Sequence, residues 1–476
     1  MNHKQNQKMY IFGKLTENKC KANVFNPATD EIITEISVAN IEVAQQALEG
    51  AQKATQTWGK TTVLERITWM HKLRDECVKN QETLRELVHQ ETGKTWAHTE
   101  DDYTLLIDSL TFYAEEISRF QPSQLIDSDE GFQHTLKYKP VGVVVAYLAW
   151  NFPLLNLAYK LGPAMATGCP IIIKPSIQSP LSAYFVGALC EKIGLPAGAV
   201  TILAGEDRTV SNYLSSSTIP SMLTLIGSIQ TGVKIMQAGS TSIKRYSMEL
   251  GGNTPYIINA DADLDLAVNI LTSLKSANAG QICVSPNRIF VHKSIKQAFI
   301  DKVLTVQSGL KLGFGKNTDA NMGPLIDKGS RDRIHGLVTD AISKGANLLC
   351  GGEFNDQEKG AFYPLTMIDD VTTAMDIYNH EIFGPVISVV YFDESDDVIA
   401  LANDTDTGLA SYVFSQNAGL AQQQADALDF GEVQVNGVKY GIHLPHLGIK
   451  QSGIGCDCSK YALNDYLSLI RKSVKK

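Results

Sequence analysis

The chain has 476 residues, 44% of them hydrophobic, and a formal charge of −9 at pH 7. This length and composition suffice for the buried cores of two or three domains of a globular protein. No apolar run reaches the roughly 18 residues of a membrane helix, and no long block of like charge favours nucleic acid or an anionic lipid surface. We therefore expect neither a membrane nor a nucleic-acid partner.

The amino-terminal segment and the cysteines indicate the compartment. Residues 1–8 are polar and lack the apolar core and cleavage site of a secretory signal. The eight cysteines are scattered along the chain, and in a chain of this size without a secretory signal this pattern predicts free thiols. Cys456 and Cys458 form a C-x-C pair without a second pair or a histidine cluster nearby, which favours a local pair over a zinc site and leaves a redox role open. We expect a cytoplasmic protein without a metal site.

In chain order, the first clear pattern is helical. Between residues 41 and 94, apolar and small residues recur at three- and four-residue steps with charges between them, as at Ile67, Met70, Leu73 and Cys77. This spacing places the apolar side chains on one face of a helix. It predicts two or three amphipathic helices.

Strand-like and helix-like segments then alternate. Strands are predicted at residues 142–148, 171–174, 200–203 and 222–226, with helices beginning at Leu154, at Leu181 and after the last strand. Such alternation is typical of βαβ units, whose parallel sheet is covered by helices on both faces.

A second alternating stretch follows residue 249. Strands are predicted at residues 255–258, 289–291 and 386–391, and helices at residues 266–277 and 297–304. The first of these helices leads to a loop that carries a cysteine. The stretch predicts a second α/β lobe.

Three motifs carry chemistry. Cys283 lies in Gly-Gln-Ile-Cys, Glu249 in Met-Glu-Leu-Gly-Gly, and Asn151 in Trp-Asn-Phe-Pro. They supply a nucleophile, a base and an amide donor. Each alone has a structural alternative: an inert core thiol, a carboxylate in a turn, and a helix-capping asparagine. In this combination and order, the chain resembles the NAD(P)-dependent aldehyde dehydrogenase superfamily along nearly its whole length.

The resemblance implies an α/β fold with two parallel-sheet lobes and a β-arm for oligomerisation. Residues 1–118 and 141–250 would form the cofactor-binding domain, and residues 251–430 the catalytic domain. Residues 119–140 and 457–476 would form the arm, through which a homodimer or homotetramer assembles. The alternation of polar and apolar residues around positions 132–138 agrees with a strand there.

The resemblance also implies a reaction. Cys283 attacks an aldehyde to give a thiohemiacetal, whose oxyanion is held by the amide of Asn151 and the backbone N–H of Cys283. Hydride transfer leaves a thioester, and Glu249 activates the water that hydrolyses it. Relatives that pass the thioester to coenzyme A typically lack this glutamate, so acid formation is expected. A catalytically silent binding protein on the same fold is the alternative from another class.

The expected cofactor is NAD or NADP. No G-x-G-x-x-G follows a strand, but residues 227–232, Gly-Ser-Ile-Gln-Thr-Gly, lie between a strand and a helix, where free N–H groups can meet a pyrophosphate. The resemblance assigns cofactor binding to Trp150, Lys174, Ser176, Gly227, Ser228, Leu250, Glu381 and Phe383. At position 177, where many NAD-preferring relatives have a glutamate, this chain has isoleucine, so NADP is permitted.

Several motifs, such as Gly-Pro-Leu-Ile-Asp at residues 323–327, resemble those of succinate-semialdehyde dehydrogenases. Those enzymes bind the distal carboxylate of the substrate with two arginines and a serine, and here the matching positions hold Tyr159, Ala277 and Tyr440. A buried carboxylate would be poorly compensated. The prediction is therefore a pocket of Tyr159, Tyr440 and His446 for an uncharged aliphatic or aromatic aldehyde, with succinate semialdehyde as the alternative. His446 replaces a common phenylalanine, and a wet surface or structural histidine is its alternative.

Overall fold

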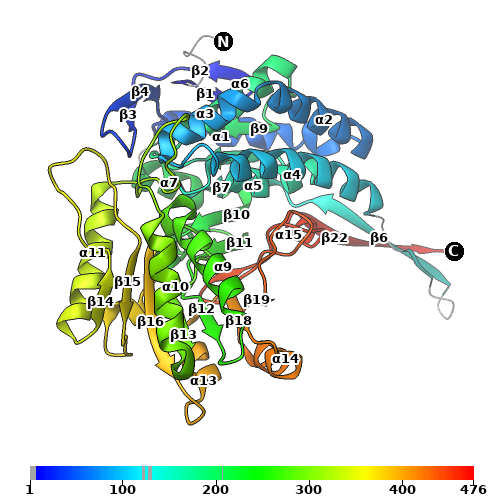
Figure 1. The fold of residues 1–476 in the computed structure, drawn as a ribbon. Coiled ribbons are helices and arrows are strands. Elements are labelled where there is room, and N and C mark those ends of the chain that lie inside the picture. Colours follow the sequence, from blue (N-terminus) through cyan, green and yellow to red (C-terminus); the bar gives the residue numbers. More distant parts are fainter. Residues whose placement is uncertain (1–6, 121–123, 127–130, 206) are drawn as a thin grey trace.

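In this computed structural model, two sheets flanked by helices form two lobes, and a β-arm projects from one of them (Figure 1). The structure describes residues 7–120, 124–126, 131–205 and 207–476. Most of the polar amino-terminal segment, and parts of the predicted arm, lie outside these ranges. In the described part of the chain, no helix has the length and apolar character needed to cross a membrane.

The first lobe is built on an eight-stranded sheet in the order β2-β1-β9-β8-β7-β10-β11-β21. Its strands are β1 (Met9–Ile11), β2 (Lys14–Thr16), β7 (Val143–Tyr147), β8 (Ile171–Lys174), β9 (Val200–Ile202), β10 (Pro220–Gly227), β11 (Arg245–Leu250) and β21 (Gly453–Ile454). The five central strands run parallel, as predicted. Strands β7 and β8 consist almost wholly of Val, Ile and Ala and are buried throughout, since helices cover both faces of the sheet.

The helices of this lobe surround the sheet (Figure 1). They are α1 (Ile41–Ala54), η2 (Trp58–Lys60), α2 (Val63–Lys79), α3 (Gln81–Thr92), α4 (Thr99–Arg119), α5 (Pro153–Thr167), α6 (Leu181–Ile193), α7 (Asp207–Ser216) and α8 (Ile229–Gly239). Helix α5 is apolar around almost its whole circumference, and 14 of its residues are buried. It is therefore a central helix, and the turn before it is held inside the protein. A two-stranded sheet of β3 (Lys21–Phe25) and β4 (Ile32–Ser37) lies apart from the main one.

The second lobe has a seven-stranded sheet in the order β14-β15-β16-β13-β12-β18-β19. Its strands are β12 (Pro255–Ile258), β13 (Arg288–His292), β14 (Asn347–Cys350), β15 (Thr366–Asp369), β16 (Val386–Phe392), β18 (Ala410–Phe414) and β19 (Glu432–Val435). Its helices are α9 (Leu264–Ser276), η3 (Ala277–Gly280), η4 (Lys293–Ile295), α10 (Lys296–Ser308), α11 (Lys328–Ser343), α12 (Asp376–Asn379), α13 (Val398–Asn403) and α14 (Ala418–Ala427). Apart from the edge strand β14, the sheet is parallel. The predicted two-lobed α/β fold is confirmed.

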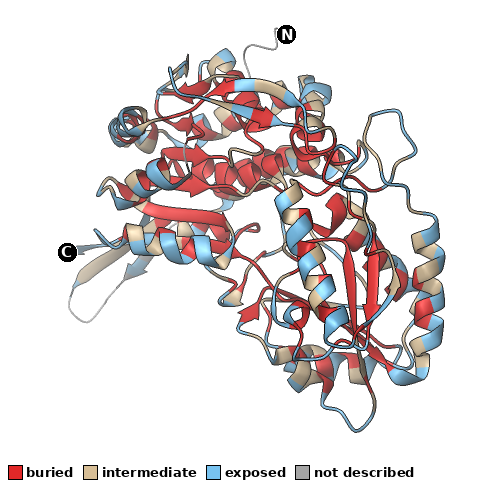
Figure 2. Ribbon diagram, turned by 90° about the vertical axis from the view of Figure 1, so that its left-hand side faces the viewer, coloured by how far each residue is buried: buried red, intermediate tan, exposed pale blue. Residues whose placement is uncertain are grey.

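The arm consists of β5 (Gln124–Ile126), β6 (Phe132–Pro140) and β22 (Leu467–Lys475). Strands β22 and β6 pair antiparallel over their whole length, and much of this ribbon is partly or fully exposed, away from the red core in Figure 2. Residues 457–466, predicted as arm, instead lie against the body, where the short helix α15 (Ala462–Asp465) contacts α5. Ala462 and Leu463 are fully buried there, and this apolar burial holds the segment.

Candidate active site

The three predicted chemical residues come from three elements and converge between the lobes. Asn151 lies in the turn between β7 and α5, Glu249 is next to last in β11, and Cys283 follows η3. Asn151 and Glu249 are 5% and 4% exposed, whereas Cys283 is partly open. The Cys283 sulfur, a Glu249 oxygen and a ring nitrogen of His446 all lie within 4.8 Å of one another. A partly open thiol beside a carboxylate is the arrangement that the motifs predict.

The loop that carries Cys283 has an unusual backbone. Asn278, Ala279 and Gly280 have φ values of 47°, 52° and 71°, a left-handed run that disfavours most side chains. A Cβ at Gly280 would lie 2.4 Å from the carbonyl oxygen of Gly384, so only glycine allows this close packing. The tight run ends helix α9 and turns the chain sharply toward Cys283.

Hydrogen bonds tie Asn151 to the same loop. Its Nδ2 donates to the carbonyl oxygen of Gln281 at 3.1 Å, while the side chain of Asn278 donates to the carbonyl oxygen of Asn151 at 3.0 Å. Asn156 donates to Asn151 Oδ1 at 3.3 Å. Because the oxygen of the Asn151 amide is engaged, its NH₂ group faces the cysteine loop as a donor.

A buried ion pair supports the turn that contains Asn151. Asp102 accepts hydrogen bonds from the backbone N–H groups of Leu154 and Leu155, each at 3.2 Å, and so caps the first turn of α5. Lys94 contacts the same carboxylate, and both side chains are fully buried. The Lys94 ammonium also lies 3.3 Å from the ring centre of Phe152.

His446 is buried next to Cys283, so the surface alternative for this histidine is wrong. Its Nε2 lies 3.9 Å from the Cys283 sulfur and 3.3 Å from Glu249 Oε1. Its Nδ1 lies 2.6 Å from Glu432 Oε1, and this oxygen also accepts from the backbone N–H of Leu447. The imidazole therefore has a carboxylate on each side.

The charges around the thiol act in opposite directions. Burial raises the pKa of the Cys283 thiol to about 12, and the Glu249 carboxylate adds to the rise, whereas contact with His446 lowers it. Burial alone would lower the pKa of His446, but Glu432 and the hydrogen bonds with Cys283 and Glu249 outweigh it and raise that pKa well above its usual value. These contacts favour the protonated form of the imidazole.

Aromatic side chains lie close to His446 and Cys283. The rings of Tyr159 and Tyr440 lie 5.8 and 6.4 Å from the ring of His446. The Tyr440 hydroxyl is 2.9 Å from that of Tyr412, which donates to the carbonyl oxygen of Val284 at 3.0 Å. The structure thus brings the three predicted pocket residues together and adds Tyr412.

Five of the predicted cofactor residues lie at or just beyond the carboxyl ends of β8, β10 and β11. They are Lys174, Ser176, Gly227, Ser228 and Leu250. Gly227 and Leu250 are opposite one another in the parallel pair, and Ser228 caps helix α8 by accepting from the N–H of Thr231. A helix amino terminus and the carboxyl edge of a parallel sheet suit a dinucleotide phosphate.

The other cofactor residues lie where the lobes meet. The Trp150 and Phe383 rings make an edge contact at 5.5 Å, and Phe383 has a left-handed φ of 51°. Glu381 accepts from the N–H of Gly252 at 3.4 Å. Burial, with some repulsion from Glu249, raises the pKa of Glu381 to about 7. These contacts join the Trp150 turn and Gly252 to the segment of residues 381–383.

Several residues of the site escaped prediction. Burial lowers the pKa of Lys275 to about 7, and the nearby Glu381 opposes that shift. Glu432 and Tyr412 belong to β19 and β18 and have no motif around them. The sequence offered no signal for Glu432 beyond its place at the start of a strand. Asn278 and Gln281 stand beside Cys283 in sequence, and the glycine between them was the available signal for a tight turn.

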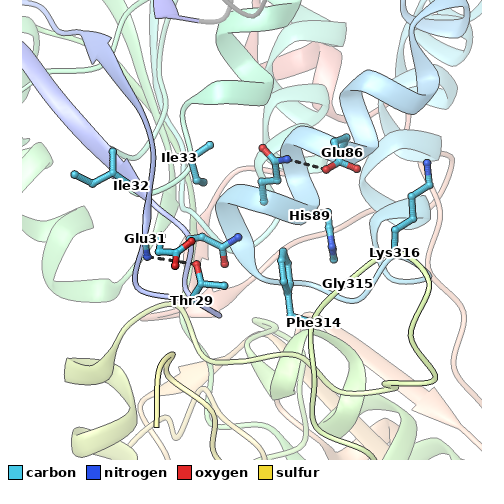
Figure 3. A pocket seen from close by; sticks show the side chains of 11 residues that line it. Thr29, Glu31, Ile32, Ile33, Glu86, His89, Phe314, Gly315 and Lys316 are labelled. Atoms are coloured by element: carbon cyan, nitrogen blue, oxygen red, sulfur yellow. Dashed lines mark hydrogen bonds between the residues drawn. The ribbon is translucent and has the colours of Figure 1, made fainter. Parts of the chain in front are cut away.

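A separate open hollow of about 440 Å³ lies where the β3–β4 turn, α3 and residues 314–316 meet (Figure 3). Within it the rings of His89 and Phe314 stack with centres 4.0 Å apart. None of its lining residues belongs to the predicted site.

Comparison with known proteins agrees with this geometry. Residues 15–471 match the model of the aldehyde dehydrogenase family. The chain belongs to this family. This aldehyde dehydrogenase is 34% identical over 447 residues to a mitochondrial succinate-semialdehyde dehydrogenase from Oryza sativa subsp. japonica, with 94% of this chain and 85% of the relative covered. It is 33% identical over 464 residues to lactaldehyde dehydrogenase from Escherichia coli, with 96% of each chain covered.

A solved betaine aldehyde dehydrogenase from Staphylococcus aureus, in complex with NAD+, has a TM-score of 0.96 at 32% identity and covers 99% of this chain and 95% of its own. The predicted oxidation of an aldehyde with NAD or NADP is confirmed, rather than the catalytically silent alternative.

Proposed function

We propose that Cys283, Glu249 and Asn151 carry out the oxidation of an aldehyde to a carboxylic acid. The observation that supports this most directly is the convergence of the thiol and the carboxylate within 4.8 Å, beside an asparagine amide that is hydrogen-bonded to the same loop. Residues 151, 249 and 283 come from distant parts of the chain, and a shared structural role would not require these three chemistries in one place.

The cycle begins at the thiol. Cys283 loses its proton, and its sulfur bonds to the carbonyl carbon, whose oxygen takes the negative charge. The Nδ2–H of Asn151 and the backbone N–H of Cys283 stabilise this oxyanion. When bound, NAD or NADP would supply the acceptor for the hydride of that carbon, which leaves a thioester on Cys283. Glu249 then takes a proton from the water that attacks the thioester, so the acid leaves and the Cys283 sulfur is restored.

The cofactor would be held by the two groups of residues described above. They are Trp150, Lys174, Ser176, Gly227, Ser228, Leu250, Glu381 and Phe383. In this proposal, Lys174 reaches the adenine ribose and Glu381 the hydroxyls of the nicotinamide ribose. Because position 177 is isoleucine, no carboxylate there repels a 2′-phosphate, so NADP is accepted as well as NAD.

The substrate proposed is an uncharged aliphatic or aromatic aldehyde. Tyr159, Tyr440 and His446 place three rings around the space beside Cys283, and aromatic rings suit apolar groups. Even with a protonated His446 between them, the carboxylates of Glu249 and Glu432 leave a net negative charge, which would repel a substrate carboxylate. Some relatives are named for succinate semialdehyde or glutarate semialdehyde, which both carry a carboxylate. Succinate semialdehyde is therefore the substrate against which uncharged aldehydes should be compared.

We further propose that the chain has two domains and forms an oligomer in the cytoplasm. Residues 1–118 and 141–250 form the cofactor-binding domain, and residues 251–430 the catalytic domain. The exposed β6–β22 ribbon joins copies of the chain into a homodimer or homotetramer, since β22 is an edge strand of the arm sheet and its outer side offers unpaired backbone groups. All eight cysteines are free, which suits the reducing cytoplasm.

The experiment that tests the chemistry follows reduced cofactor and acid separately. With Glu249→Gln, rapid mixing with aldehyde should give a burst of reduced cofactor of about one equivalent per site, followed by little turnover, because deacylation lacks its base. Cys283→Ser should abolish the burst, while Cys456→Ser, at a second partly open thiol, should preserve it. Full steady-state acid formation by Glu249→Gln would remove Glu249 from the mechanism.

The substrate is tested by kcat/KM for hexanal, benzaldehyde and succinate semialdehyde with each cofactor. We expect the two uncharged aldehydes to be preferred. A clear preference for succinate semialdehyde would refute the pocket proposal but leave the chemistry of Cys283 intact.

A further inference from the structure

Three side chains from distant segments, Glu432, His446 and Cys283, contact one another in sequence. The reaction described above uses Cys283 but neither of the other two. Glu432 begins β19, His446 lies in the segment between β19 and β20 (Ile449–Lys450), and Cys283 follows η3. The Glu432 oxygen is 2.6 Å from His446 Nδ1, and His446 Nε2 is 3.9 Å from the Cys283 sulfur, within hydrogen-bond range for sulfur. An imidazole oriented on one side by a carboxylate therefore presents its other nitrogen to the nucleophile.

Glu432 determines which way the imidazole faces. The same Glu432 oxygen accepts from His446 Nδ1 and from the Leu447 backbone N–H, so it holds both the ring and the chain beside it. His446 also exchanges two backbone hydrogen bonds with Asp457, each at 2.8 Å. With Nδ1–H donated to Glu432, Nε2 is the nitrogen that can act on Cys283 and Glu249.

The surroundings favour a charged imidazole. Two carboxylates contact the ring, and with the thiol protonated this gives one positive and two negative charges. The other titratable groups near the ring are Tyr159, Tyr412, Tyr440, Asp457 and Cys458, and the charge of Asp457 is paired with Lys160. Lys160 forms an ion pair with Asp457. Among the described residues, His446 is therefore the basic side chain that contacts the Cys283 sulfur.

We propose that His446 is a catalytic residue: its imidazolium, fixed by Glu432, stabilises the thiolate of Cys283. The S–H bond of Cys283 breaks, its proton passes through water molecules to the solvent, and the sulfur anion faces the Nε2–H of His446. No electron leaves the protein in this step, and the thiolate then bonds to the aldehyde carbon. The inference rests on the proposed role of Cys283 as nucleophile.

This role accounts for a histidine, rather than an uncharged ring, beside Cys283. A phenylalanine could line the pocket, but it could not offset the burial and the Glu249 charge that oppose ionisation of Cys283. A neutral pocket residue would also have no need of the Glu432 carboxylate.

The test measures ionisation of Cys283 directly, without aldehyde or cofactor. The rate of alkylation by iodoacetamide is followed between pH 6 and 10, and the label on Cys283 is quantified by peptide mass spectrometry because Cys20 is exposed and reacts too. The variants are His446→Phe, His446→Gln, which keeps a neutral donor, and Glu432→Gln. Thermal unfolding of each variant shows whether it is folded.

We expect alkylation of Cys283 in all three variants to be slower than in the native enzyme at each pH of this range, by about tenfold for each unit by which the thiol pKa rises. A His446→Gln profile that superimposes on the native one would overturn the proposal, because a neutral donor would then suffice. Failure of the proposed function looks different: Cys283→Ser would retain aldehyde oxidation, whatever the alkylation profiles show.

Discussion

Lys160 and Asp457, 297 positions apart in the sequence, form a buried ion pair in which the ammonium lies 2.7 and 2.6 Å from the two carboxylate oxygens. Lys160 belongs to the central helix α5, next to Tyr159 of the substrate pocket. Asp457 is paired through its backbone with His446. This ion pair therefore fixes the segment that carries His446 against the helix that carries Tyr159.

Removing one charge of this pair should destabilise the enzyme strongly. Asp457→Asn leaves the Lys160 ammonium buried without a counter-charge, and such changes cost about 3–5 kcal/mol. Urea denaturation should show a loss of that order in the free energy of unfolding. Asp429→Asn breaks the largely exposed contact with Lys450 and should cost less than about 1 kcal/mol. Equal losses in the two variants would contradict the structural role of the buried pair.

Asn151→Ala tests the oxyanion donor. Loss of one preorganised donor costs about 2.7–4 kcal/mol of transition-state stabilisation, so kcat should fall by about 100- to 1,000-fold. Alkylation of Cys283 by iodoacetamide, which forms no oxyanion, should change little. Parallel losses in both measurements would mean instead that Asn151 positions the cysteine loop through its bond to Gln281.

Cofactor binding should weaken in acid through Glu381. Burial raises the pKa of this carboxyl to about 7, so it is protonated below that pH and loses acceptor capacity for the ribose hydroxyls. Calorimetric titration should show the dissociation constant of NAD rising as the pH falls from 8 to 6. Lys275, whose pKa burial lowers to about 7, gains charge over the same range, so the matched control is Glu381→Gln. An unchanged pH dependence in that variant would assign the effect to Lys275.

The sequence predicted most of the elements because their signals are local. The Ile-rich strand at residues 171–174 and the helix before Cys283 were both found within two residues of their observed ends. Ala462 and Leu463 were assigned to the arm because nothing in four residues tells a short buried helix from a strand; contact with α5 decides it. Glu432 was missed because its partner, His446, is 14 residues away, and only the fold brings them together.

Ile177→Glu tests the basis of cofactor choice. Ile177 is half-buried just beyond β8, close in sequence to Lys174, and a carboxylate there would repel the 2′-phosphate of NADP. We expect kcat/KM for NADP to fall by at least about tenfold, which corresponds to about 1.4 kcal/mol, while the value for NAD is maintained or rises. Ile177→Gln is the uncharged control of the same length. If both variants lose NADP activity equally, shape rather than charge determines the preference.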